Sequence, residues 1–296
     1  MLRHLVSAGA LAAVVAGATA GCASYELIEN VSYDERNGER GRLDLYLPDP
    51  RPAGDVPLIV LIHGGGWRTG SKDIMNQQAP RWAHAGYAVA AINYRLVPRG
   101  AYPLLIQDVF CALGFLESQA DEYSFDLDRI GATGYSAGAH LAMLLGYAAP
   151  TGDFEPDCGT IPTVRPAAVV SGAGPSDLTL YDDPQAVTEF LGGTRAEVPD
   201  IYQLASPVNH VTADDPPTLL IYGTDDLIVP YEHAQAIDKA LGDAGVDHRL
   251  MTIRGAGHLL NPGADLADAV FPIVSNEGPE GFAATLDFFD DVMGQP

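Results

Sequence analysis

The segment Gly134-Tyr135-Ser136-Ala137-Gly138 constrains the fold of this chain more than any other feature. An apolar stretch typical of a β-strand precedes it, and a stretch of small residues typical of a helix follows it. Glycines two residues to either side of a serine permit a sharp strand-to-helix turn, because side chains there would collide with neighbouring backbone. The spacing therefore predicts that Ser136 is a nucleophile exposed at the end of a strand, although ordinary glycine turns share the pattern.

A second glycine-rich turn lies about seventy residues upstream. The apolar run 56–62 ends in His63-Gly64-Gly65-Gly66-Trp67, an order typical of a loop whose backbone N–H groups stabilise a negatively charged oxygen. We expect His63 to brace this loop. Trp67 is predicted to bind substrate by lining the pocket, with an amide contribution as the alternative. The predicted donors of this oxyanion hole are Gly65, Gly66 and Ala137.

An acid and a base follow two later strand-like stretches. Residues 218–222 lead into Asp225 and Asp226, and residues 248–253 lead into His258. The chain order serine, aspartate, histidine is the order of α/β-hydrolases and differs from other serine hydrolases. We predict Asp226 as the acid because of its spacing from Gly223 and Pro230, with Asp225 as the alternative and Asp177 as a structural loop residue. His258 would then take the proton of Ser136.

The remaining histidines receive structural or surface roles. His140 is expected to form hydrogen bonds within the helix that follows Ser136. No grouping of His, Cys, Asp and Glu has the spacing of a metal site, so neither a metal nor an organic cofactor is expected. Surface or satisfied structural positions are predicted for His84, His210, His233 and His248.

Apolar runs alternate with helical stretches along most of the chain, which predicts an α/β fold with a mostly parallel eight-stranded sheet. Ligands of such sheets bind at the carboxyl ends of the strands, where the candidate residues fall. Segments 151–165 and 178–211 are the two candidates for short cap or lid loops. Two early strands, 25–33 and 42–47, are expected to be antiparallel, and the expected parallel strands are 56–62, 87–93, 129–134, 167–171, 218–222 and 248–253.

These motifs, together with Asn93-Tyr94-Arg95-Leu96 and Gly174-Pro175-Ser176-Asp177-Leu178, resemble those of the α/β-hydrolase carboxylesterases. The similarity is nearest to the bacterial acetylxylan/feruloyl-esterase-like (BD-FAE-like) group and extends to hormone-sensitive-lipase-like esterases. The resemblance implies cleavage of short-chain carboxylic esters, of small molecules or carbohydrates, through an acyl-enzyme. Amide or formamide hydrolysis, or peptidase activity, on the same residues is the alternative, and a non-enzymatic binding module is a third.

The sequence departs from the family pattern at two places. Leu227 follows the acid where proline is frequent, and Leu259-Leu260 follows the base where Gly-Phe is common. Bulk beside His258 is expected to narrow the leaving-group side of the pocket, which favours short acyl groups.

The amino-terminal residues have the pattern of an export signal. A short polar start precedes a small apolar run, and Ala18-Thr19-Ala20 fits signal-peptidase recognition. The sequence Ala20-Gly21-Cys22 also resembles a lipobox, with Thr19 where leucine is usual, so Cys22 is a candidate lipid anchor. We therefore expect residues 1–20 to be a signal peptide (1–21 in a lipoprotein) and residues 22–296 to be a single domain in the periplasm, at the cell surface or secreted.

Export also affects the two remaining cysteines, since oxidising compartments permit a disulfide between Cys111 and Cys158; separate thiols are the alternative. The formal net charge is −23, from 39 acidic against 16 basic side chains. Such a charge repels nucleic acid phosphates and anionic lipid, so nucleic acid is excluded as a partner.

Overall fold

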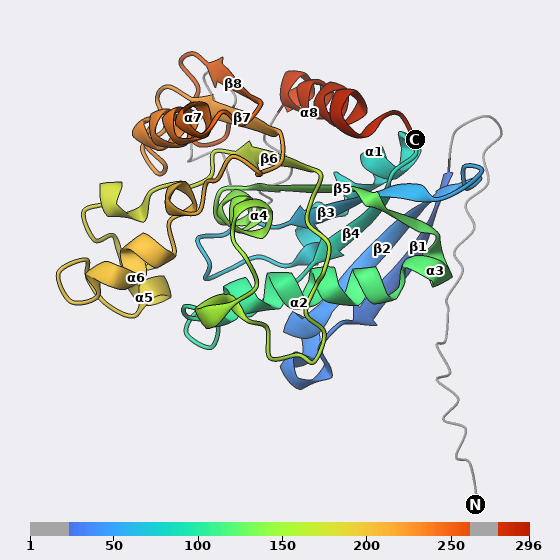
Figure 1. The fold of residues 1–296 in the computed structure, drawn as a ribbon, viewed down its shortest axis with the longest axis horizontal. Coiled ribbons are helices and arrows are strands. Elements are labelled where there is room, and N and C mark those ends of the chain that lie inside the picture. Colours follow the sequence, from blue (N-terminus) through green and yellow to red (C-terminus); the bar gives the residue numbers. More distant parts are fainter. Residues whose placement is uncertain (1–23, 261–277) are drawn as a thin grey trace, which may run out of the picture.

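A computed structural model describes residues 24–260 and 278–296 of the chain, which form an eight-stranded sheet with helices on both faces (Figure 1). The strand order is β1-β2-β4-β3-β5-β6-β7-β8, with β2 antiparallel to both of its neighbours and every other pair parallel. This is the mostly parallel sheet that the sequence predicts. The strands are β1 (Ser24–Ser32), β2 (Arg42–Asp49), β3 (Val56–Ile62), β4 (Ala88–Ile92), β5 (Phe125–Tyr135), β6 (Ala168–Gly172), β7 (Thr218–Gly223) and β8 (His248–Ile253).

Helices cover both faces of the sheet because its central strands are apolar on both sides. Every residue of β3, β4 and β6 is buried. The α-helices are α1 (Ala79–His84), α2 (Leu104–Ser118), α3 (Ala120–Tyr123), α4 (Ala137–Tyr147), α5 (Gln185–Leu191), α6 (Pro199–Leu204), α7 (Glu232–Ala244) and α8 (Gly278–Met293). Short 3-10 helices are η1 (Glu35–Gly41), η2 (Lys72–Met75), η3 (Gly152–Phe154), η4 (Leu178–Leu180) and η5 (Pro207–Asn209).

Alternate residues of one strand enter different cores. Val60 of β3 packs in a cluster with side chains of α2 and α4, whereas Ile59 and Leu61 pack with Trp82 of α1 and Phe289 of α8. The period of two along a strand therefore divides the hydrophobic interior into layers on the two sides of the sheet. This sandwich holds the carboxyl ends of the parallel strands at one edge.

The first residue of β1 lies at the other side of the sheet, where the parallel strands begin. Ser24 of β1 pairs with Asp49 at the end of β2, and Leu43 near the start of β2 pairs with Ile92 at the end of β4. β1 therefore runs in the same direction as the parallel strands, and its first residue lies at their amino edge.

Strand β5 is longer than the sequence predicts, because it begins at Phe125 and not at Arg129. Its first residues pair with Val56 and Pro57 before the register shifts at Leu58. The polar residues Asp126 and Asp128 in this part of the strand conceal it from a search for apolar runs.

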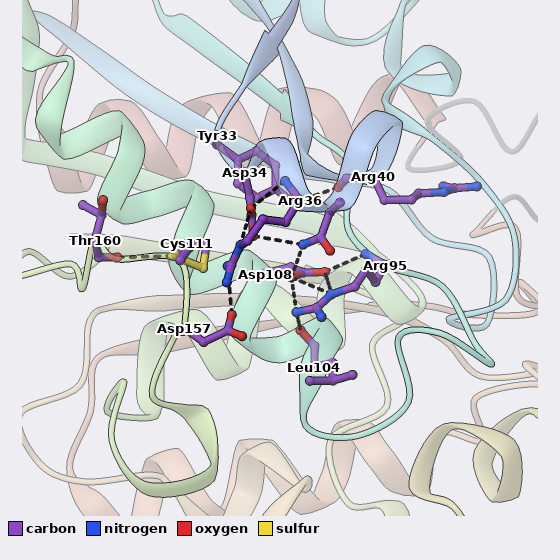
Figure 2. Close-up of a disulfide and its surroundings, with 12 residues drawn as sticks. Tyr33, Asp34, Arg36, Arg40, Arg95, Leu104, Asp108, Cys111, Asp157 and Thr160 are labelled. Carbon is purple, nitrogen blue, oxygen red and sulfur yellow. Dashed lines mark hydrogen bonds and ion pairs between the residues drawn. A yellow bond between two sulfur atoms is a disulfide. The ribbon is translucent and has the colours of Figure 1, made fainter.

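A disulfide joins Cys111 of α2 to Cys158, which resolves the alternative that the sequence left open (Figure 2). Beside it, Arg36 binds both Asp34 and Asp157, while the buried Asp108 of α2 accepts hydrogen bonds from Arg95. The disulfide and the Arg36–Asp157 ion pair fasten the segment 151–165 to α2 and to η1.

Among residues 24–260 and 278–296, no helix has the length and apolar character needed to cross a membrane.

Candidate active site

Ser136 occupies the corner between β5 and α4. Its backbone has φ 55° and ψ −123°, a conformation that residues with side chains rarely adopt. The corner is tight, since a Cβ on Gly134 would lie 2.5 Å from the carbonyl carbon of Gly138, and a Cβ on Gly138 would lie 2.1 Å from the oxygen of Ile62. Glycine at both positions therefore permits the turn that presents the serine hydroxyl at the carboxyl edge of the sheet.

Three side chains from distant parts of the chain meet at this edge. The Ser136 Oγ lies 3.0 Å from Nε2 of His258, and Nδ1 of His258 lies 2.7 Å from Oδ2 of Asp226. With the carboxylate accepting the Nδ1 proton, Nε2 is left to accept the proton of the serine hydroxyl. All three residues are buried but reach one another in series, which is the arrangement of a nucleophile, a base and an orienting acid.

The structure separates the two adjacent carboxylates. The Asp226 side chain is fully buried, and its Oδ1 accepts hydrogen bonds from the amides of Ile228 and Val229. Asp225 is exposed and accepts a hydrogen bond from the hydroxyl of Thr224. Asp177 caps η4 by accepting from the amide of Thr179, so it has the structural role that the sequence predicts.

The glycine loop after β3 packs directly against the serine corner. A Cβ on Gly64 would lie 2.7 Å from the carbonyl oxygen of Tyr135 and 3.4 Å from Cβ of Ser136. Gly65 and Gly66 have φ values of 122° and 58°, which favour glycine. The amides of Gly65, Gly66 and Ala137 donate to no acceptor within the described part of the chain, and they are the groups predicted to bind an oxyanion.

The buried side chain of His63 packs against this loop and braces it, as the sequence predicts. Its Nδ1 lies 2.8 Å from the carbonyl oxygen of Gly64, and its ring stacks on Tyr94, whose hydroxyl donates to the carbonyl of His63. Burial lowers the pKa of His63 to about 4, so the ring is neutral near pH 7.

Trp67 does not have the substrate-binding role that the sequence predicts. Its side chain is only 3% exposed, stacks on Phe190 of α5, and donates from Nε1 to Nδ1 of His140. The backbone of Trp67 has φ 59°, and the indole lies in the core that α2 and α4 share with the sheet. Trp67 therefore fastens the glycine loop to the protein interior.

The prediction that the His140 side chain forms its hydrogen bonds within its own helix is wrong. This residue bonds outside its own helix, accepting from Trp67 and donating from Nε2 to the carbonyl of Ala205. Both ring nitrogens are occupied, and burial lowers the pKa of His140 to about 4. The histidine links the glycine loop to the segment after α6.

His233 of α7 is fully buried. Its Nδ1 accepts hydrogen bonds from the amides of Ser176 and Asp177, and its ring packs against Tyr181 at a centroid distance of 4.7 Å. Burial is the main cause that lowers its pKa to about 4. The predicted structural role holds for this residue, but its ring is only half satisfied, because the buried Nε2 has no hydrogen-bond partner among the described residues.

The segment 178–211 borders the site on two sides. At one end, a Cβ on Gly66 would lie 3.8 Å from Cβ of Ala186 in α5. At the other end, the hydroxyl of Tyr181 donates to the carbonyl of Ile228 in the acid loop. The second candidate cap, 151–165, is instead bound to α2 by the disulfide and by a hydrogen bond from Gln107 to the carbonyl of Asp153. The sequence contained no signal for the contacts of Ala186 and Tyr181, which depend on the tertiary fold.

The two leucines after His258 have different environments. Leu260 has φ 53° and is buried in the core that faces α1 and α8, so its bulk does not narrow the pocket as expected. Leu259 is partly exposed. Residues 261–277 lie outside the described part of the chain.

The described residues contain no group of three or more His, Cys, Asp or Glu side chains arranged to hold a metal ion.

Comparison with known proteins places the chain among esterases of this fold. The model of the BD-FAE family matches residues 43–241, which is more than half of the chain. The chain belongs to the BD-FAE family. This membership confirms the resemblance deduced from the sequence motifs, and the eight-stranded sheet is the α/β-hydrolase fold of that family.

Individual relatives of this BD-FAE protein carry esterase names. It is 34% identical over 70% of its length to the probable carboxylic ester hydrolase LipM of Mycobacterium tuberculosis, of which it covers 49%. The chain spans about half the length of the curated relatives it matches.

Solved structures resemble this BD-FAE protein over more of their length. A truncated carbohydrate esterase from gut microbiota has a TM-score of 0.77 and 27% identity, with 90% of this chain and 96% of that chain covered. Esterase B of Lactobacillus rhamnosis, inhibited by a tributyrin phosphonate, has a TM-score of 0.76 and 25% identity, with 92% and 87% covered.

Proposed function

We propose that the protein is a serine hydrolase that cleaves short-chain carboxylic esters through an acyl-enzyme. The observation that carries this proposal is the chain of contacts Ser136–His258–Asp226, at 3.0 and 2.7 Å, beside a glycine loop whose amides at Gly65 and Gly66 have no acceptor among the described residues. Family membership and the esterase names of the relatives support the same reaction class.

The geometry suggests how each step proceeds. The Ser136 Oγ attacks the ester carbonyl carbon while Nε2 of His258 takes its proton, and Asp226 stabilises the resulting imidazolium. The amides of Gly65, Gly66 and Ala137 bind the oxygen that becomes negative, an interaction worth about 3 to 4 kcal/mol for each such donor. His258 then gives its proton to the leaving alcohol oxygen. A water molecule attacks the acyl-enzyme with His258 as base, which releases the acid and restores Ser136.

We still propose esters with short acyl groups as substrates, although the buried Leu260 does not narrow the pocket and so gives no support for this preference. Two observations favour a small apolar acyl group: α5 lies against the glycine loop at Gly66, and Esterase B, a structural neighbour, accepts a tributyrin phosphonate. The neighbouring carbohydrate esterase makes acetyl or feruloyl groups on sugars candidate esters as well.

The test combines turnover with active-site labelling. We expect the protein to hydrolyse p-nitrophenyl acetate and butyrate faster than the longer-chain esters, and a fluorophosphonate probe to label Ser136. The Ser136→Ala variant should lose both the turnover and the label. A matched anilide that is cleaved faster than the ester would identify an amidase, and absence of labelling in folded protein would contradict the whole proposal.

We further propose that the protein is exported and held by a lipid on Cys22. Export rests on the amino-terminal signal pattern that ends in Ala18-Thr19-Ala20, and the lipid anchor rests on Ala20-Gly21-Cys22; both lie outside the described residues. Mass spectrometry of the mature amino terminus is the test, and an unmodified terminus beginning at Gly21 would indicate soluble export.

A further inference from the structure

The orientation of the glycine loop is set by what its carbonyl groups bind. The carbonyl oxygen of Gly65 accepts three hydrogen bonds, each 3.1 Å long, from the amides of Arg68 and Thr69 and from the Thr69 hydroxyl. The carbonyl oxygen of Gly64 lies 2.8 Å from Nδ1 of His63. The Gly65 carbonyl therefore points toward Arg68 and Thr69, and the Gly64 carbonyl points toward the ring of His63.

Each of these carbonyls belongs to the same peptide group as a candidate oxyanion donor. In a planar trans peptide, the C=O of one residue and the N–H of the next point in opposite directions. The Gly65 carbonyl and the Gly66 amide form one such group, and the only cis peptides among the described residues precede prolines. Fixing the Gly65 oxygen on Thr69 therefore directs the Gly66 N–H away from Thr69, where it has no protein acceptor within the described chain.

We propose that Thr69 is a positioning residue for the oxyanion hole, because its hydroxyl holds the Gly65–Gly66 peptide in the orientation that aims the Gly66 amide at the reacting oxygen. Thr69 is exposed and does not touch the substrate in this proposal. The loop is built around the contact: a Cβ on Gly65 would lie 2.2 Å from the backbone oxygen of Thr69 and 2.9 Å from its Oγ1. This inference rests on the proposed ester hydrolysis at Ser136.

The expected effect is specific to the transition state. The negative oxygen exists only during acyl transfer, so a misdirected Gly66 amide lowers kcat and kcat/KM equally and leaves KM unchanged. Two backbone amides still hold the Gly65 carbonyl when the hydroxyl is removed, so the loss corresponds to one hydrogen bond. For a bond of ordinary strength this is about a five-fold fall in kcat.

The experiment compares T69V, which keeps the shape of threonine without its hydroxyl, with T69S, which keeps the hydroxyl. T69V should lower kcat about five-fold at constant KM, and should weaken inhibition by a trifluoromethyl ketone by the same factor, because that inhibitor forms an oxyanion on the enzyme. T69S should remain within about two-fold of the wild type in both measurements.

T188V is the matched control. The Thr188 hydroxyl also donates to a backbone carbonyl, that of Gln185, over 3.1 Å, but the peptide it holds carries no oxyanion donor. T188V should keep wild-type kcat, and melting temperatures should establish that all variants are folded.

Three outcomes overturn the proposal: T69V with wild-type kcat, T69S as impaired as T69V, or T188V as impaired as T69V. These outcomes are distinguishable from failure of the proposed function. If the proposed function is wrong, the wild-type protein shows no ester hydrolysis that depends on Ser136, as judged by comparison with Ser136→Ala. The proposal for Thr69 is then also wrong.

Discussion

Asp225 and Asp226 are neighbours in the chain with opposite environments. Asp226 is buried between His258 and two loop amides, so its charge is fixed in place by hydrogen bonds. Asp225 faces solvent. A carboxylate that fixes the imidazole tautomer cannot be replaced by an amide, because an amide NH2 next to Nδ1 favours the tautomer with its proton on Nε2.

Asp226→Asn should therefore lower kcat for a short-chain ester by a factor on the order of 10⁴, with little change in stability. Asp225→Asn is the adjacent control and should stay within about two-fold of wild type, since an amide oxygen can still accept from Thr224. Steady-state kinetics of both variants decide the matter. Equal losses in the two variants, or a larger loss in Asp225→Asn, would contradict the assignment.

Sequence patterns identified Ser136 and His258 because their neighbours in the chain are the glycines that shape each loop. The partners of Trp67 and His140 could not be identified in this way. The indole donates to a histidine 73 residues away, and that histidine donates to a carbonyl 65 residues further on. Such contacts depend on how elements pack, so the buried position of Trp67 followed only from the structure.

At the scale of secondary-structure elements, the corner between β5 and α4 depends on close backbone approach. The missing side chain of Gly138 leaves room for the carbonyl oxygens of Ile62, the last residue of β3, and of His63, which follows it. Because β3 is paired to β5 along its length, its backbone cannot move aside to admit a methyl group.

Gly138→Ala should lower the free energy of unfolding by about 3 kcal/mol or more, since overpacking here acts on backbone atoms and not on flexible side chains. Gly242→Ala in α7 is the matched control. A Cβ there would meet only Cε1 of His248 at 3.6 Å, so the higher helix propensity of alanine should stabilise the protein by up to about 1 kcal/mol. Urea unfolding measures both, and similar stabilities of the two variants would refute the packing argument.

The burial of the secondary-structure elements explains why most strands could be predicted from the sequence and why the start of β5 could not. Strands such as β3 consist of apolar residues throughout, because both of their faces are covered by helices. The start of β5 carries aspartates at the rim of the sheet, where the polar side chains of a strand reach solvent. Its length is set by pairing with Val56, which composition does not encode.

On the scale of the whole molecule, three buried neutral histidines link stability to pH. Burial lowers the pKa values of His63, His140 and His233 to about 4 from an ordinary value of 6.5. The unfolded chain therefore takes up protons that the folded protein does not. Their contribution to stability is fully present above about pH 6.5 and is lost as the pH falls toward about 4, at up to about 1.4 kcal/mol per pH unit for each histidine.

His233→Asn should reduce this pH dependence. The Asn side-chain oxygen can still accept from the amides of Ser176 and Asp177, but it does not titrate. Between about pH 7.5 and about pH 5, the variant should lose roughly two-thirds of the stability that the wild type loses, as measured by urea unfolding. A wild-type slope in His233→Asn would show that this histidine does not contribute.

The entry of β1 at the amino edge of the sheet governs how an anchored molecule would face its surroundings. Ser24 lies at the opposite end of the parallel strands from Ser136, and only Ala23 separates it from Cys22 in the sequence. With the proposed anchor at Cys22, the lipid would be attached next to the amino ends of the parallel strands, whereas Ser136 lies at their carboxyl ends. Under the proposed anchoring, Ser136 therefore faces away from the bilayer to which the enzyme is attached.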